Sequence, residues 1–316
     1  MTPPIAVEGL VRRFGDLVAV DGIDLVVEQG EVFGFLGPNG AGKSTAVRML
    51  TTLLRPSAGV ARVAGFDVVA DAAEVRKRIG VALQDAAIDP LMTGWELLQL
   101  QSVLHGLPRR VARSRSGELL ERVGLTGAAG RRVGTYSGGM RRRLDLALSL
   151  VHEPQVLFLD EPTTGLDPTS RMALWEEVRS LNTDHGTTVF LTTQYLEEAD
   201  ELAQRVAIID GGRIVREGTP GSLKAAVGAP TLRVDIDLEQ VEAARSTLSA
   251  HGDERPARQG RVAIGLRAGT AGMPDVVRAL DDAGIVVHHL QLDEPSLDDV
   301  FADATGRRLE GVAERS

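Results

Sequence analysis

Short apolar runs alternate with segments of helical periodicity over the first two thirds of the chain. Residues 32–36 (VFGFL) form an apolar run that ends in a glycine-rich turn, and residues 44–54 follow it with helical spacing as far as Pro56. Uninterrupted runs of this kind are typical of buried parallel strands. Strands that alternate with helices predict an α/β fold with a parallel sheet. Further strands are predicted at 81–83, 156–159, 188–191 and 206–209, with a mostly helical insertion at 85–153.

The pattern changes beyond residue 218. A segment rich in glycine and proline, 219–230, reads as a linker after a first domain at 1–218. Apolar and polar residues then alternate in TLRVDIDL, RVAIGLRA and IVVHHLQL, which is typical of half-buried strands. Each is followed by a helical pattern, so residues 231–306 are predicted to form a small α+β domain. The polar tail 307–316 is expected to fray.

The composition limits the kinds of protein that this chain can be. A length of 316 residues fits two domains, and 43% apolar residues are enough for sizeable cores. The chain has no cysteine, which excludes disulfides and thiolate chemistry. The net charge of −9 argues against a nucleic-acid partner, which would require a basic face. No signal-like start and no apolar run of about 18 residues is present, so we expect a soluble or peripheral chain.

A phosphate-binding loop follows the first predicted strand. GPNGAGKST fits the pattern G-x-x-x-x-G-K-[ST] between a strand and a helix. Its glycines let backbone N–H groups converge on phosphate oxygens, and the helix N-terminus adds positive potential. Lys43 would reach the β- and γ-phosphates, and Ser44 would ligate Mg²⁺. The predicted nucleotide contacts are Gly37, Pro38, Asn39, Gly40, Ala41, Gly42, Lys43, Ser44 and Thr45.

Two further segments are candidates for chemistry. VLFLDEP places Asp160 and Glu161 at the end of a buried strand, where Asp160 would hold Mg²⁺ through water and Glu161 could polarise an attacking water. The alternative is a solvated strand terminus. In TYSGGMRRRLDLALSL a Ser-Gly-Gly turn opens an amphipathic helix at Ser137. That turn is either a second anion site or a plain N-cap.

The order of these motifs resembles that of ATP-binding cassette (ABC) ATPases, over residues 5–218. YSGGM stands where the family has its signature, usually Leu-Ser-Gly-Gly-Gln. The resemblance identifies a Q-loop glutamine, a D-loop at 164–167 and an aromatic that stacks on adenine. It implies a P-loop NTPase fold with a helical subdomain, and ATP and Mg²⁺ as ligands. It also implies nucleotide contacts from Phe14, Gln84, Ser137, Gly138, Gly139 and Asp167, and Mg²⁺ contacts from Ser44, Gln84 and Asp160.

The resemblance also implies partners. Two copies would sandwich two ATP molecules head to tail, with residues 137–139 of one copy contacting the γ-phosphate held by Lys43 of the other. The segment 85–153 would carry a groove for a cytoplasmic helix of a membrane subunit. Because this chain has no predicted spanning helix, that subunit would be another chain. The protein would then lie peripherally at the cytoplasmic face of the cell membrane.

A narrower resemblance is to the ATP-binding subunits of daunorubicin/doxorubicin-type drug exporters, which pair with ABC-2 type permeases. It rests on residues 134–168 and on SLDDVFADATG, which is similar to that group's Leu-Asp-Glu-Val-Phe motif. Asp299 stands there in place of the glutamate. Ser296 and Asp299 fit a capping box ahead of an apolar helical face. This helix is either an ordinary docking helix or a regulatory or dimer-assembly surface.

Two residues depart from the general ABC pattern. Met140 replaces the signature glutamine, and Gln194, in LTTQYLEEAD, stands where most members have a histidine. An amide can donate a hydrogen bond to the γ-phosphate but cannot shuttle a proton, which leaves Glu161 as the candidate base. Glu197, Glu198 and Asp200 are interpreted as the solvated first turn of the next helix.

The predicted function is ATP hydrolysis that drives export of a hydrophobic drug or secondary metabolite. Within the family, a lipid or polysaccharide exporter remains open, because the permease holds the substrate site. A soluble ABC protein acting on ribosomes or DNA is a different class, as is a nucleotide-gated binding protein with negligible turnover, which Gln194 would favour. The single phosphate loop, the absence of heptads and the acidic charge argue against action on ribosomes or DNA.

Overall fold

The structure is a computed structural model that describes residues 2–83, 88–258 and 260–307. These residues form two compact units, divided after Pro220. Each unit has its own hydrophobic core, so each is described by itself.

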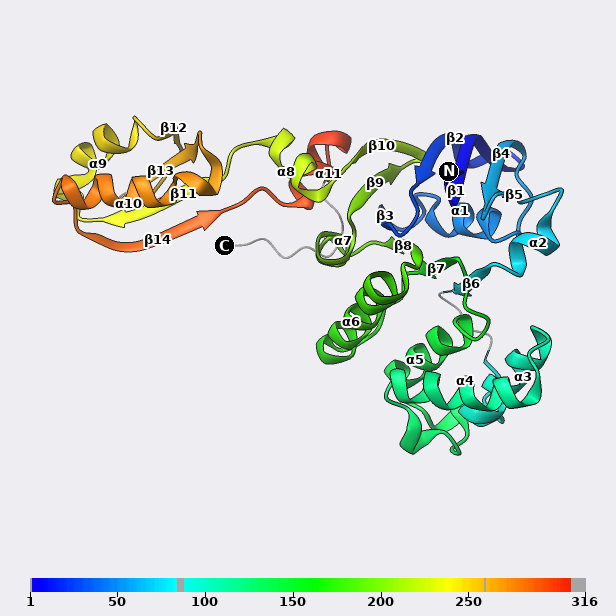
Figure 1. Ribbon diagram of the computed structural model, residues 1–316. Coiled ribbons are helices and arrows are strands. Elements are labelled where there is room, and N and C mark those ends of the chain that lie inside the picture. Colours follow the sequence, from blue (N-terminus) through cyan, green and yellow to red (C-terminus); the bar gives the residue numbers. More distant parts are fainter. Residues whose placement is uncertain (1, 84–87, 259, 308–316) are drawn as a thin grey trace. The chain divides into compact units, whose positions relative to one another are not determined.

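A six-stranded sheet organises the first unit (Figure 1). Its strand order is β10-β9-β3-β8-β7-β6, parallel from β9 to β6, with β10 antiparallel at the edge. The predicted α/β fold with a parallel sheet is thereby confirmed. The strands are β3 (Val32–Leu36), β6 (Ile79–Ala82), β7 (Val156–Asp160), β8 (Thr188–Thr193), β9 (Arg205–Asp210) and β10 (Arg213–Gly218).

One face of this sheet packs on α1 (Lys43–Leu50) and on a second, antiparallel sheet. The order of that sheet is β2-β1-β4-β5, and the short helix α2 (Ala72–Arg76) follows it. The helix α1 is shorter than the predicted 44–54, because Thr52 adopts a left-handed φ of 65° and ends it. The strands are β1 (Ile5–Phe14), β2 (Leu17–Val27), β4 (Ala58–Val63) and β5 (Phe66–Asp67).

The sequence pattern did not predict this antiparallel sheet. The pairing of β1 with β2 shifts register at three places, and its pairing with β4 shifts between Glu8 and Val11. Each bulge displaces the following side chains to the opposite face, which destroys the two-residue alternation by which strands are recognised.

The other face of the parallel sheet packs on helices. Alternate residues of β7 divide between the two cores, with Phe158 on the α1 side and Leu157 on the helical side. The predicted helical insertion is confirmed, with two single-turn 3₁₀ helices at Thr126–Ala128 and Val133–Thr135. The helices of this layer are α3 (Gly94–Leu104), α4 (Arg109–Arg122), α5 (Gly138–Ser149), α6 (Pro168–His185) and α7 (Leu196–Leu202).

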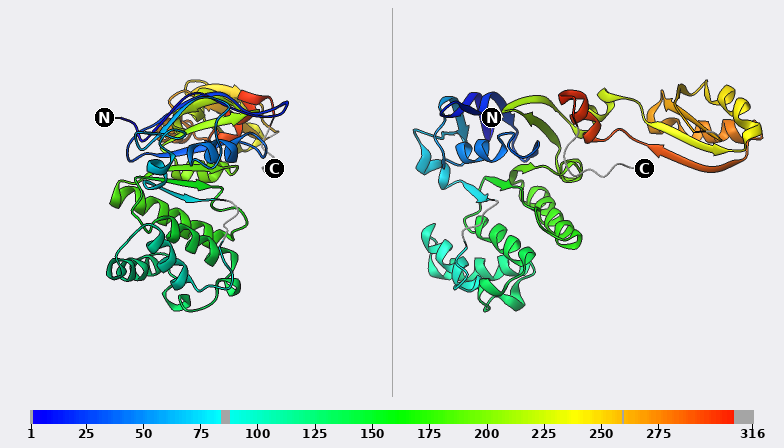
Figure 2. Two further views of the ribbon diagram at one scale, coloured as in Figure 1. Left: turned by 90° about the vertical axis from the view of Figure 1, so that its right-hand side faces the viewer. Right: turned by 180° about the vertical axis from the view of Figure 1, so that it is seen from behind.

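The second unit is an α+β domain, as predicted. It begins near α8 (Pro220–Val227), a helix in the segment expected to be a linker. Its antiparallel sheet has the order β12-β13-β11-β14, and two helices pack on one face (Figure 2). The chain order β-α-β-β-α-β is that of a ferredoxin-like domain. Its elements are β11 (Thr231–Ile236), α9 (Val241–Leu248), β12 (Gly252–Arg255), β13 (Arg261–Leu266), α10 (Met273–Asp282) and β14 (Val287–Asp293).

The last described helix is α11 (Leu297–Thr305), and its predicted capping box is confirmed. The Ser296 hydroxyl accepts from the Asp299 N–H at 3.3 Å, and the Asp299 carboxylate accepts from the Ser296 N–H at 2.9 Å. Leu297, Val300 and Phe301 form its buried face. The strand β12 was not predicted, because three of its four residues are charged and exposed.

Phe190 should be a main determinant of the stability of the first unit. Its ring centroid lies 5.7, 5.5 and 5.6 Å from those of Phe33, Phe35 and Phe158, and its side chain is fully buried. We expect Phe190→Ala to lower the free energy of unfolding by about 3–5 kcal/mol. Urea unfolding followed by circular dichroism measures this. Leu17→Ala, at an exposed position, is the control, and equal losses for both variants would contradict the prediction.

Candidate functional site

The loop between β3 and α1 wraps around the ammonium group of Lys43. Lys43 Nζ donates to the carbonyl of Gly37 at 2.8 Å and to that of Pro38 at 3.0 Å. A Cβ at Gly37 would lie 2.3 Å from the Ile209 carbonyl, and Gly42 has a φ of 107°, so both positions require glycine. Because Gly42 makes no side-chain cap, the first N–H groups of α1 have no side-chain acceptor. This cradle fits an anion.

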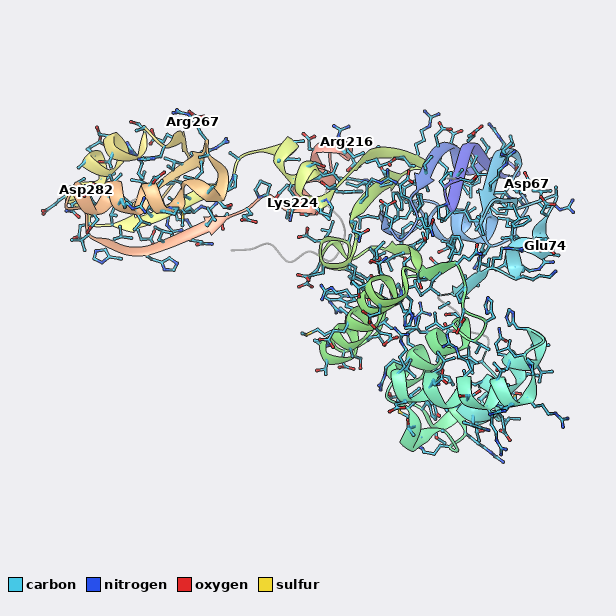
Figure 3. The ribbon with its side chains drawn as sticks, viewed as in Figure 1. Asp67, Glu74, Arg216, Lys224, Arg267 and Asp282 are labelled. Carbon is cyan, nitrogen blue, oxygen red and sulfur yellow. The ribbon has the colours of Figure 1, made fainter. Side chains whose placement is uncertain are left out.

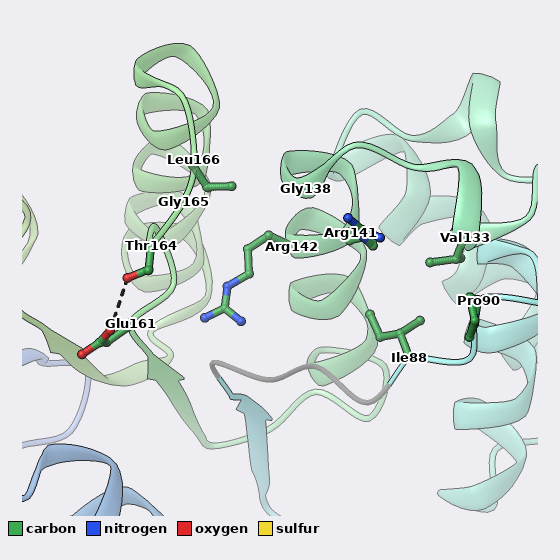
Figure 4. A pocket seen from close by; sticks show the side chains of 10 residues that line it. All are labelled: Ile88, Pro90, Val133, Gly138, Arg141, Arg142, Glu161, Thr164, Gly165 and Leu166. Carbon is green, nitrogen blue, oxygen red and sulfur yellow. Dashed lines mark hydrogen bonds between the residues drawn. The ribbon is translucent and has the colours of Figure 1, made fainter. Parts of the chain in front are cut away.

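The two predicted carboxylates lie beside this loop. Asp160 is buried at the end of β7, and its Oδ1 accepts from the hydroxyls of Ser44 at 3.2 Å and Thr192 at 2.5 Å. Glu161 is also buried, with Oε1 3.2 Å from Lys43 Nζ. The Thr164 hydroxyl donates to Glu161 Oε2 at 3.3 Å (Figure 4). A hydroxyl, a carboxylate and an ion pair therefore meet at one edge of the sheet.

An unusual backbone conformation brings both carboxylates to this edge. Adjacent residues of a strand point to opposite faces, and Glu161 breaks this rule with a left-handed φ of 47°. Its N–H donates to the carbonyl and the hydroxyl of Thr192, each at 3.1 Å. Such a conformation costs on the order of 1–3 kcal/mol in a residue other than glycine, and it persists only where neighbours enforce it.

Gln194 lies next to the phosphate loop. Leu36 pairs with Thr193 across β3 and β8, and the Gly37 N–H donates to the Thr193 carbonyl at 3.2 Å. Gln194 follows directly and is half-buried. The predicted Q-loop residue, Gln84, lies outside the described residues. Phe14 ends β1 with 45% of its surface exposed, and the Arg12 guanidinium lies 4.4 Å from its ring centroid.

The Ser-Gly-Gly turn caps α5 and faces outward. Ser137 Oγ accepts from the Met140 N–H at 3.2 Å, and both Ser137 and Gly138 are exposed. A Cβ at Gly139 would lie 2.8 Å from Ser170 Oγ, so this position packs closely against α6. Asp167, the predicted D-loop contact, caps α6, and its hydrogen bonds from Ser170 lower the pKa of its carboxyl. The turn is therefore both a helix cap and an accessible helix N-terminus.

The interpretation of Glu198 as a solvated residue was wrong. Its side chain is fully buried, Trp175 Nε1 donates to its Oε1 at 3.1 Å, and its Oε2 has no hydrogen-bond partner in the described part of the chain. Burial raises the pKa of the Glu198 carboxyl. Its neighbour Glu197 is exposed, as expected, and pairs with Arg171 at 3.5 Å.

A signal for this burial was present in the sequence. Glu198, Ala199 and Leu202 have the spacing of one helical face, and all three are buried. The first turn of α7 is therefore only half solvated, and Glu198 belongs to its inner side.

Among residues 2–83, 88–258 and 260–307, no helix is long and apolar enough to cross a bilayer. No group of three or more His, Cys, Asp or Glu side chains gathers there as a metal cage. Ser44 and Asp160 form an oxygen pair of the kind that Mg²⁺ uses when phosphates complete its coordination.

Comparison with known protein families gives two matches in this chain. The profile of the family described as "ABC transporter" matches residues 20–164. That described as "ATP-binding protein DrrA1-3-like, C-terminal domain" matches residues 218–305.

Curated relatives match over nearly the full length. The daunorubicin resistance ATP-binding protein DrrA3 of Streptomyces coeruleorubidus is 49% identical over 98% of each chain. The linearmycin resistance ATP-binding protein LnrL of Bacillus subtilis is 36% identical over 96% of this chain and 98% of its own. The Nod factor export ATP-binding protein I of Ralstonia nicotianae is 39% identical over 98% of this chain and 95% of its own.

Solved structures of ABC cassettes match most of this chain. The protein cbiO1 of Clostridium perfringens, part of the ABC transporter complex cbiONQ, has a TM-score of 0.66 and 25% identity, covering 79% of this chain and 96% of its own. The cassette MJ0796, in a dimeric structure with ADP and phosphate, has a TM-score of 0.63 and 24% identity. The match covers 68% of this chain and 98% of the MJ0796 chain. The likeness to MJ0796 supports the fold alone.

Glu198→Gln should change the pH dependence of stability. Because the pKa of the folded carboxyl is raised, stability is greatest below the unfolded pKa and falls as pH rises toward the folded one. Glutamine stays neutral and does not lose this stability. The thermal midpoint of the variant minus that of wild type should therefore increase as the pH is raised from 5 to 8. Glu197→Gln, on the same helix but exposed, is the control. A difference between Glu198→Gln and wild type that is equal at both pH values would contradict this.

Proposed function

The chain belongs to the DrrA-like ATP-binding proteins of ABC transporters, and we propose that it hydrolyses ATP to drive export of a hydrophobic drug or secondary metabolite through a separate permease. The observation that carries the proposal is the convergence of Lys43, Ser44, Asp160 and Glu161 at one sheet edge. The resistance proteins among its relatives support a drug as the exported compound. The Nod factor export relative keeps a lipid or polysaccharide as the second candidate.

The phosphate loop would hold the nucleotide. Lys43 and the N–H groups at the start of α1 offer positive charge and donors, while Asn39 and Gly40 are exposed for its entry. Phe14, exposed at the end of β1, would serve as the platform for adenine. A phosphate bound to Lys43 would compete with Glu161 for the same ammonium group, since the two lie 3.2 Å apart. Binding of ATP would then release the Glu161 carboxylate for chemistry.

Mg²⁺ fits the oxygen pair of Ser44 and Asp160, with Gln84 as a further proposed ligand. When bound, it supplies positive charge that neutralises the phosphates. The chain's own residues would do the rest. Glu161 would accept the proton of the attacking water, and the Gln194 side chain would donate a hydrogen bond to the γ-phosphate.

The working unit would be a homodimer bound to an ABC-2 type permease. The exposed turn at Ser137 would complete the site of a second copy, in a head-to-tail arrangement around two ATP molecules. Apolar side chains on α3 support a protein partner, because Val103 and Leu104 are 62% and 71% exposed. Through the permease the protein would lie at the cytoplasmic face of the cell membrane.

Nucleic acid is not expected as a partner. Several basic side chains on the surface are paired with acids, as Lys77 and Arg78 are with Glu74 and Arg267 is with Asp253. Figure 3 shows both acidic and basic side chains, such as Asp282 and Arg267 on the second unit. The net charge of −9 does not favour binding to a phosphate backbone.

Glu161→Gln should abolish hydrolysis while preserving nucleotide binding. An amide cannot accept the proton of water, so phosphate release should fall by about 10²–10⁴-fold. The affinity for a fluorescent ATP analogue should be retained. Glu197→Gln is the matched control and should behave as wild type. Wild-type phosphate release from Glu161→Gln would show that another group is the base.

Substitution of Gln194 tests the contact with the γ-phosphate. Gln194→Ala removes the donor and should lower ATP turnover, whereas Gln194→His retains a donor and should keep turnover closer to wild type. Steady-state phosphate release at saturating ATP measures both. If Gln194→Ala equals wild type, the proposed hydrogen bond is unimportant for hydrolysis.

A further inference from the structure

Arg142 is a buried cation that links the helix α5 to the strand end carrying Glu161. Its Nη2 donates to the Asp160 carbonyl at 2.8 Å, and its Nε donates to the Pro162 carbonyl at 2.9 Å. Its Nη1 donates to the Leu83 carbonyl at the end of the β6 segment. Figure 4 shows the side chain extending from α5 toward Glu161. One guanidinium therefore joins α5 to two separate segments of the sheet.

Two of these carbonyls belong to the residues on either side of Glu161. Asp160 precedes Glu161 and Pro162 follows it, so the fork of Arg142 holds the peptide group that enters the left-handed residue and the one that leaves Pro162. Glu161 N–H is fixed on the other side by Thr192. A strained φ persists when surrounding contacts enforce it. The hydrogen bonds from Arg142 and to Thr192 enforce the φ of Glu161 in this way. They set the direction in which the Glu161 carboxylate points.

The charge of Arg142 is balanced from its own helix. Asp145 Oδ2 lies 3.3 Å from Nη1, and both side chains are about nine-tenths buried. Burial raises the pKa of the Asp145 carboxyl to about 6, while Arg142 acts in the opposite direction. A buried pair of this kind contributes little net stability. The structural role of Arg142 lies instead in its hydrogen bonds, because its planar guanidinium fixes three backbone carbonyls at once.

We propose that Arg142 is a positioning residue that holds Glu161 in its reactive orientation and couples that orientation to the helix α5. The proposal rests on the proposed function, because it takes Glu161 as the base. The N-terminus of α5 carries Ser137 and Gly138, and Arg142 lies little more than one helical turn beyond them. A second copy whose nucleotide contacts that N-terminus would therefore act on Glu161 through a rigid helix and one side chain.

Arg142→Lys tests the proposal. Lysine keeps the charge but lacks the fork, so it cannot hold both flanking carbonyls in the same geometry. We expect kcat for ATP hydrolysis to fall by about 10–100-fold, with KM for ATP within about twofold of wild type. Arg143→Lys is the matched control, since Arg143 donates to the Val123 carbonyl away from the strand end. It should keep the wild-type kcat.

A double substitution separates positioning from a merely structural role. If Arg142 acts through Glu161, then Arg142→Lys combined with Glu161→Gln should be no slower than Glu161→Gln alone. A further loss in the double variant, or a wild-type kcat for Arg142→Lys, overturns the inference while leaving the proposed function intact. Wild-type phosphate release from Glu161→Gln overturns both.

A second variant covers the case in which Arg142→Lys does not fold. Asp145→Asn removes the carboxylate that orients Nη1 but leaves the three carbonyl acceptors in place. Its kcat should fall at least about threefold, with unchanged KM and with a circular dichroism spectrum like that of wild type. An unchanged kcat in this folded variant contradicts the proposal.

Discussion

The buried ion pair between Lys43 and Glu161 constrains the whole edge of the sheet around it. Both side chains are almost completely buried, and burying two charges costs several kcal/mol per ion unless each is fully hydrogen-bonded. The loop carbonyls of Gly37 and Pro38 take two donors of the ammonium group and Glu161 takes the third, while Thr164 donates to the carboxylate. The loop folds tightly around Lys43, and residue 37, where a Cβ would meet the Ile209 carbonyl, and residue 42, with a φ of 107°, both need glycine.

The same constraint joins segments that are far apart in the chain. A parallel sheet brings the carboxyl ends of its strands to one edge, so β3, β7 and β8 deliver the loop, the carboxylates and Thr192 to one place. Thr192 donates to Asp160 and accepts from Glu161, which connects β8 to β7. Arg142 adds the helical layer to this set. Hydrogen bonds therefore connect β7, β8 and α5 at this edge of the sheet.

Much of this organisation follows from the sequence because it depends on local patterns. The glycine-rich loop with its lysine, the apolar strands and the capping box at Ser296 are each read within about ten residues. The antiparallel sheet was not predicted, because bulges in β1 break the alternation of apolar and polar residues. The strand β12 was not predicted, because its exposed charged residues resemble those of a loop. The spacing of Glu198 on one face of α7 signals its burial, but the partners of Glu198 and Arg142 lie about 20–60 positions away, and a single sequence has no local signal for such partners.

The contacts that hold Glu161 matter more because residue 194 is a glutamine, which has no titrating group. An amide neither takes up nor releases a proton at physiological pH, so in the proposed mechanism the acid–base step falls to Glu161 alone. A single base is effective only if its direction is fixed, and Glu161 reaches the site through a strained backbone held by Thr192 and Arg142. A histidine at position 194 would relax that demand by offering a second proton acceptor. In that mechanism, the glutamine would make the rate depend on how precisely the Glu161 backbone is held, and with it on the position of α5.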